Sequence, residues 1–334
     1  MKTKKHVWMK IIFGVFLAAL FVGLLCICMT KSKADKIPHR YASAKEGCRL
    51  LLDNTEYYDK YSQNDIDFRL QKSGATLQEL FDESTKSIQD FSFMEKLAID
   101  YRLSQMQKTI EENGYVFPPI EEIVFIKMDM TLESGAEGYT HGTQIYLNAD
   151  DVSRYAVNCF DEKMIHNMDK VLWHELFHCL TRNNSDFRKE MYSLINFTVT
   201  DSEFEIPPCV KNLYISNPDV EHHDSYATFE IEGREIDCFI VWKTTMSFDE
   251  AHSKFIECNE VALVPIDGTD TYYTKEQASN FDEVFGTNTG YVIDPEECMA
   301  DNFMYAMIYG VAGRKGKGYP NPEIIRGIVE NLSR

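Results

Sequence analysis

The stretch VLWHELFHCLTR, residues 171–182, gives the strongest indication of the fold of this chain. Residues four apart on an α-helix lie on one face, so the imidazoles of His174 and His178 can hold one cation. Glu175 lies beside them and completes the H-E-x-x-H pattern, which supplies two metal ligands and a general base. Apolar residues on more than one side of the motif predict a buried helix over residues 164–182. The alternative is a core helix that carries two unrelated histidines.

A second, acidic motif follows at PEECMADNF, residues 295–303. A catalytic zinc site has three protein ligands and an open position, and a His, His, Glu set is one known combination. Glu297 and Asp301 are four apart on a predicted helix, so Glu297 can complete the site while Asp301 orients a ligating histidine. Glu296 is the competing ligand, but its i+4 partner is Ala300, which supplies no such support. The alternative to a metal site is an acidic first turn stabilised by the helix dipole. This alternative would explain the presence of Glu296, but not that of Asp301.

His174-Glu-Leu-Phe-His178 followed by Glu297-x-x-Ala-Asp301 resembles the motif pair of the gluzincin metallopeptidases, the thermolysin-like and neprilysin-like clan. The resemblance implies that His174, His178 and Glu297 hold one zinc ion, that Glu175 is the base, and that Asp301 supports His174. It covers these motifs, their order and a predicted strand before them. The clan's downstream histidine, which stabilises the transition state, has no clear match in this sequence.

The same resemblance implies an α+β fold with a zincin-like metallopeptidase core, in which a small mixed sheet lies against the active-site helix and a helical carboxy-terminal part follows. β-branched and aromatic residues predict strands over residues 122–130 and 143–148. In that clan an edge strand pairs with extended substrate, and residues 139–147 would fill this role. Tyr139 and His141 are therefore predicted to bind substrate, although His141 could equally be a turn residue in solvent.

The amino-terminal region, residues 35–115, is predicted to be helical. Residues 41–61 indicate a helix with many exposed charges, and residues 63–74 indicate a polar loop. The apolar spacing over residues 93–112 predicts an amphipathic helix that ends at Gly114.

Residues 116–334 are predicted to form the catalytic domain, with a β-rich insertion over about residues 197–280. Alternating patterns predict strands over residues 226–232, 235–244 and 261–265, separated by glycine turns. We interpret this insertion as a hairpin layer that covers one side of the cleft.

The amino terminus carries a nineteen-residue uncharged run, residues 11–29, preceded by four lysines. Such a run is long enough to cross a bilayer as a helix, and the lysines favour a cytoplasmic amino terminus. Residues 1–34 are therefore predicted to be a signal anchor, which would make the protein a single-pass membrane protein with an extracytoplasmic catalytic domain. Alternatively they form a signal peptide cleaved after Ala34, which would release the protein as a secreted one.

Charge and cysteine content exclude other classes of function. Of the 34 basic residues, six lie in residues 1–34, which leaves 28 basic against 53 acidic residues and a net charge of −25 for the remainder. Such a surface repels nucleic acid, so no nucleic-acid partner is expected. Seven of the nine cysteines lie outside the apolar run, and an odd number argues against a complete disulfide framework.

The predicted reaction is metal-assisted hydrolysis of a peptide or protein substrate, with one zinc ion as cofactor. Glu175 would take a proton from water and pass it to the leaving nitrogen. Tyr291, six residues before Glu297, is a candidate donor to the developing oxyanion, or else a core tyrosine. We expect an endopeptidase rather than an exopeptidase. The alternatives are an inactive zinc-binding ectodomain, against which the intact Glu175 argues, and a hydrolase of a non-peptide amide in the cell envelope.

Overall fold

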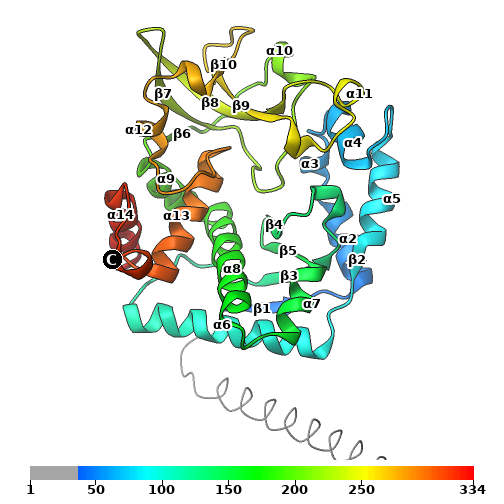
Figure 1. Cartoon of the computed structure of the whole chain (residues 1–334), viewed down its shortest axis with the longest axis vertical. Helices are drawn as coiled ribbons and strands as arrows, with labels where there is room; N and C mark the ends of the chain where they lie inside the picture. Colours follow the sequence, from blue (N-terminus) through cyan, green and yellow to red (C-terminus); the bar gives the residue numbers. More distant parts are fainter. Residues whose placement is uncertain (1–36) are drawn as a thin grey trace, which may run out of the picture.

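A computed structural model of the chain describes residues 37–334 (Figure 1). The predicted signal anchor or signal peptide, residues 1–34, lies outside the described residues. Within residues 37–334, none of the helices has the length and apolar character that a membrane span requires. The fold is mixed α+β, as predicted, and it contains one mixed sheet and one antiparallel sheet.

The first sheet is the mixed one. Its strands are β1 (His39–Tyr41), β2 (Ile88–Gln89), β3 (Ile123–Met128), β4 (Gly138–His141) and β5 (Gln144–Asn148). Strands β1, β3 and β5 are parallel, while β4 is antiparallel to β5 and forms one edge. All six residues of β3 are buried, as expected for the apolar centre of a sheet. The strands predicted over residues 122–130 and 143–148 are therefore confirmed as β3 and β5.

Helix α8 (Glu162–Asn183) contains the H-E-x-x-H motif and packs against the edge strand β4 on one side and α13 (Pro295–Tyr309) on the other (Figure 1). The helix predicted over residues 93–112 is confirmed as α6 (Phe93–Asn113), which ends at Gly114 in the left-handed conformation. The remaining helices of this half are α7 (Ala149–Val157), α9 (Ser185–Ser193) and the closing helix α14 (Pro322–Leu332). One apolar core includes residues of α6, β3, α8 and α13, which holds the motif helices against the sheet.

The continuous helix predicted over residues 41–61 is wrong. Tyr41 belongs to β1, where it pairs with Phe125 of β3 and stacks on its ring at a centroid distance of 5.6 Å. Two separate helices follow, α2 (Ala44–Asp53) and α3 (Thr55–Tyr58). Sheet pairing and aromatic packing therefore override the local helical pattern.

The loop predicted over residues 63–74 is also wrong, because it contains helix α4 (Gln63–Leu70), which begins with a capping box. Its buried residues include three charged ones, Asp65, Asp67 and Arg69. The Arg69 guanidinium donates to Asp65 at 2.7 Å and to Glu133 at 3.0 Å, and both its own side chain and that of Asp65 are buried. Apolar periodicity is the main sequence signal of a helix, and a helix that buries ion pairs lacks it. Helix α5 (Leu77–Ser87) follows.

The second sheet is antiparallel throughout and lies above α8 in Figure 1. Its strands are β6 (Thr198–Val199), β7 (Ser225–Ile231), β8 (Arg234–Thr244), β9 (Asn259–Pro265) and β10 (Tyr273–Thr274). The three strands predicted within residues 197–280 are confirmed as β7, β8 and β9. Short helices connect and flank them: α10 (Pro208–Lys211), α11 (Phe248–Ala251) and α12 (Phe281–Phe285), with 3-10 turns η1 (Thr131–Glu133), η2 (Phe255–Glu257), η3 (Lys275–Gln277) and η4 (Arg314–Gly316).

Candidate metal centre

Helices α8 and α13 bring the three predicted ligands together. Nε2 of His174 lies 3.0 Å from Oε2 of Glu297, and Nε2 of His178 lies 3.6 Å from the same oxygen. Glu297 reaches this position because Asp294 caps α13 and Pro295 begins it, which makes Glu297 the third residue of the first turn. His178 and Glu297 are fully buried.

These atoms fit a divalent metal ion. The two imidazole nitrogens and the carboxylate oxygen all lie within 4.8 Å of one another. Nε2 of His178 is buried and has no hydrogen-bond partner among residues 37–334, and a buried polar atom without a partner destabilises the fold. A cation at this point would satisfy that atom, and two imidazoles with one carboxylate form a donor set that suits zinc.

Each histidine is oriented by a carboxylate on its other ring nitrogen. Nδ1 of His174 lies 3.2 Å from Oδ1 of Asp301, as predicted, and Thr289 donates to the other Asp301 oxygen at 2.5 Å. Nδ1 of His178 lies 2.9 Å from Oε1 of Glu296. Such contacts leave both Nε2 atoms available to bind a metal ion, and contacts of this kind raise the basicity of a histidine ligand.

Protonation of this cluster competes with metal binding. Burial disfavours the charged form of His174, but hydrogen bonds to Asp301 and Glu297 outweigh burial and raise its pKa. Burial likewise opposes ionisation of Glu297, yet the hydrogen bond with His174 and the nearby imidazole of His178 lower its pKa. A bound cation must displace the imidazole protons, so we expect metal affinity to fall as the pH falls.

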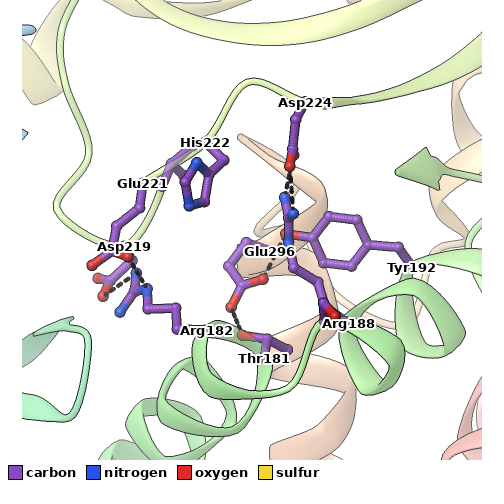
Figure 2. A pocket seen from close by; sticks show the side chains of 11 residues that line it. Thr181, Arg182, Arg188, Tyr192, Asp219, Glu221, His222, Asp224 and Glu296 are labelled. Atoms are coloured by element: carbon purple, nitrogen blue, oxygen red, sulfur yellow. Dashed lines mark hydrogen bonds and ion pairs between the residues drawn. The ribbon is translucent and has the colours of Figure 1, made fainter. Parts of the chain in front are cut away.

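The sequence predicts Glu296 as a competing ligand or a first-turn acid, and no motif indicates its contact with His178. Its carboxylate accepts hydrogen bonds of 2.5 Å from the hydroxyls of Thr181 and Tyr192. Figure 2 shows these groups in a pocket where Arg188 also forms a paired contact with Asp224. No local sequence pattern indicates this contact, because it follows from the packing of α8 against α13, which places His174 beside Asp301 and His178 beside Glu296.

The predicted base, Glu175, is buried against strand β4. Its Oε2 accepts a 2.8 Å hydrogen bond from the hydroxyl of Thr140, a contact that sequence reasoning missed. Burial raises the pKa of Glu175 above its ordinary value. A raised pKa brings a carboxylate closer to the working range of a general base near neutral pH.

Gly138 allows strand β4 to approach Glu175 closely. A Cβ atom at residue 138 would lie 3.0 Å from Oε1 of Glu175 and 3.2 Å from the carbonyl oxygen of Tyr146. If Glu175 is the predicted base, Gly138→Ala is expected to displace it and to lower kcat/KM for the predicted peptide hydrolysis by about tenfold, because small misplacements of a general base are costly. The measurement is steady-state kinetics beside metal content, which should not change. Unaltered kcat/KM would show that the close approach is unimportant.

Two donors fix the second oxygen of Glu297. The hydroxyl of Tyr291 donates to Oε1 at 2.9 Å, and the amide of Asn217 donates to the same atom at 2.5 Å. Tyr291 is 40% exposed and, with His174 and Glu175, borders a cavity of about 260 Å³. The structure therefore brings Tyr291 to the predicted site. It also brings Asn217 there, which the sequence did not indicate.

Tyr139 and His141, predicted to contact substrate, are not brought to this cluster. They alternate along β4 with Gly138 and Thr140, which face Glu175, so their side chains point to the other face of the sheet. The Tyr139 ring stacks on Tyr146 at 4.5 Å, and both predicted side chains are less than 5% exposed. Neither side chain reaches the three clustered ligands, but Tyr139 borders a second cavity that also includes Gly138, Asp219 and Tyr291, so substrate binding by Tyr139 and His141 stays a prediction.

Asp219 also reaches the centre, and no motif signalled it. Its Oδ1 lies 3.8 Å from Nε2 of His178 and accepts a 2.7 Å hydrogen bond from the amide of Thr140. Glu175, His178 and Asp219 form a second group whose ligand atoms could hold an ion. Both groups use the same histidine nitrogen, so they are alternative positions for one ion.

The chain was also compared with known proteins. No protein-family model, curated protein or solved structure matches it. The geometry of the centre therefore carries the functional argument.

Proposed function

We propose that this chain is a zinc-dependent peptidase, anchored in a membrane or secreted by means of residues 1–34, that hydrolyses peptide bonds in peptides or proteins. The observation that carries the proposal is the arrangement of His174, His178 and Glu297 around one point, with Glu175 beside them. A purely structural metal site needs no buried carboxylate next to its ligands, so Glu175 favours hydrolysis over binding alone.

The surroundings of α8 support a zincin-like core and the proposed relation to the gluzincins. A mixed sheet has its antiparallel edge strand β4 next to the motif helix, and α13 supplies the third ligand from the other side. This is the order of parts that the two motifs imply.

The proposed chemistry assigns a task to each residue. A zinc ion, when bound, lowers the pKa of water and polarises a carbonyl group. The Glu175 carboxylate accepts the proton of the attacking water and delivers it to the leaving nitrogen. Thr140 holds Glu175 in position through its hydroxyl, and Asp301 and Glu296 keep the imidazoles aligned.

Tyr291 is proposed to donate its hydroxyl hydrogen to the substrate oxygen that becomes negative. Tyr291→Phe is expected to lower kcat by about tenfold to a hundredfold. This is somewhat less than the effect of removing a dedicated oxyanion donor, because the Tyr291 hydroxyl also donates to Glu297 and is not reserved for the substrate. Metal content, measured in parallel, should stay the same because the three ligands remain. Unchanged turnover would remove Tyr291 from the mechanism.

A peptide library tests the proposed function. We expect zinc-loaded wild-type protein to cleave library peptides, and a Glu175→Gln variant with the same zinc content to leave them intact. Equal behaviour of the two proteins toward every peptide would instead favour a zinc-binding ectodomain. Cleavage confined to non-peptide amides would favour the cell-envelope alternative.

A further inference from the structure

The most exposed apolar side chains of residues 37–334 gather at one end of the molecule. Val157 is 83% exposed, Phe160 71%, Phe93 69% and Val116 64%, whereas every other large apolar side chain in this part of the chain is at most 53% exposed. All four lie on or beside α6, the end of α7 and the connection from α7 to α8, at the lower end of the molecule in Figure 1. Single exposed apolar residues are ordinary, but a group of them indicates a contact surface.

Contacts between α6 and α7 place three of these residues near one another. The hydroxyl of Ser153 in α7 donates to Glu95 in the first turn of α6 at 2.7 Å. Phe93 precedes Glu95 by two residues, and Val157 lies one helical turn after Ser153 on the same face of α7. Phe160 follows Val157 by three residues. We call Phe93, Val157 and Phe160 the apolar end face.

The described part of the chain begins at this same end. The imidazole of His39, two residues after Ile37, contacts Asp100 of α6 at 2.9 Å. Eight residue steps lead from Met29, the last residue of the predicted anchor's apolar run, to Ile37. Eight residues span at most about 29 Å even when fully extended. A bilayer crossed by residues 11–29 would therefore have its surface within about 29 Å of Ile37.

The surroundings of the apolar end face suit lipid headgroups better than a protein partner. Arg154, Glu162 and Lys163 are exposed on the same stretch of chain and carry charges of both signs. The centre of a protein–protein interface is depleted of charged residues. The headgroup region of a bilayer accommodates charged groups at the level where aromatic and aliphatic side chains enter the acyl boundary.

We propose that the apolar end face rests on the bilayer that anchors the chain, with Phe93, Val157 and Phe160 in the headgroup region. The proposal rests on the anchored form of the proposed function. Helix α8 then leads away from the bilayer (Figure 1). His174 follows Glu162, the first residue of α8, by twelve residues, which places the metal centre about 18 Å further along the helix. This fixed height favours substrate segments that lie close to the membrane surface.

Photocrosslinking of the full-length chain in phosphatidylcholine nanodiscs tests the contact. A diazirine amino acid is placed at residue 157 in one protein and at residue 256 in the control. Ile256 is also an exposed aliphatic residue, but it lies just before β9 of the second sheet. Mass spectrometry should find at least about tenfold more phosphatidylcholine adduct at residue 157, because acyl chains surround an apolar side chain in the headgroup region.

A charge on the same face supplies a second measurement. Phe93→Asp should lower the lipid adduct at residue 157 by at least about threefold, because a carboxylate opposes entry into the acyl boundary. Met246→Asp is the matched control, at an exposed apolar residue between β8 and α11, and should leave the adduct unchanged. An adduct that Phe93→Asp does not lower would show that the apolar end face is not what meets the lipid, which overturns the proposal.

The other outcomes separate this proposal from the proposed function. Equal lipid adducts at residues 157 and 256 would overturn the contact. Crosslinks from residue 157 to residues 1–36 or to a second copy of the chain, in place of lipid, would also overturn it, because another occupant would cover the face. Each of these results leaves the peptidase standing. A protein that forms the lipid adducts but cleaves no peptide would overturn the peptidase alone, and failure of the full-length chain to enter nanodiscs would overturn both the anchor and the contact.

Discussion

Replacement of Glu175 by Gln is expected to lower kcat by about 10²- to 10⁴-fold, which is the usual contribution of a general base. Glutamine keeps the size of the side chain and can still bond to the hydroxyl of Thr140, so the packing against β4 should persist. It cannot take a proton from water. The loss should therefore appear in kcat rather than in KM or in stability.

The metal content of this variant supplies the control. Glu175 is not one of the three clustered ligands His174, His178 and Glu297, so zinc binding should remain near the wild-type level. Glu162→Gln, an exposed change at the start of the same helix, should alter neither property. Full turnover by Glu175→Gln would remove the proposed base and with it the proposed mechanism.

Glu297→Gln is expected to weaken zinc binding by more than about a hundredfold, since it removes the charge of a proposed direct ligand. Glu296→Gln should weaken zinc binding by about ten- to a hundredfold, as expected for a residue that orients a ligand. The two residues are neighbours in the first turn of α13, and both are buried. Their tasks differ because Glu297 faces both Nε2 atoms, while Glu296 faces Nδ1 of His178. Competition with a chelator of known affinity measures both losses.

The order of these two effects matters more than their size. A larger loss for Glu296→Gln than for Glu297→Gln would reverse the assignment of ligand and supporting residue. Circular dichroism of each variant should match the wild type, so that a lost fold is not mistaken for a lost ligand.

The sequence was sufficient to predict those parts of the centre that depend on local helix geometry. His174, Glu175 and His178 lie within about one turn of α8, and Glu297 and Asp301 lie within about one turn of α13, so their spacing predicted which residues of each helix lie close together. Strands with apolar, β-branched runs, such as β3, were predictable because that pattern is also local.

Contacts between distant segments were not predictable in this way. Asn217 and Asp219 come from the stretch between the two motifs, and only the tertiary fold brings them to Glu297 and His178. Both contacts join residues far apart in the chain, which no local pattern encodes. Helix α4 was missed for another reason, because its buried residues include the charged Asp65, Asp67 and Arg69.

Strand β4 shows how one residue of register changes a prediction. The edge strand was expected near the right residues, but Tyr139 and His141 were assigned to the cleft. Successive side chains of a strand face opposite ways, so the residues that face Glu175 are Gly138 and Thr140. The sequence alone does not show which of the two alternating sets of side chains on a strand faces the helix.

The central claim is that α8 and α13 share one divalent ion through three side chains. The most direct measurement is a crystal structure of zinc-loaded protein with an anomalous difference map at the zinc absorption edge. We predict one peak about 2.0–2.2 Å from Nε2 of His174, Nε2 of His178 and Oε2 of Glu297. A peak held by Glu175, His178 and Asp219, with the Glu297 carboxylate out of bonding distance, would contradict the claim.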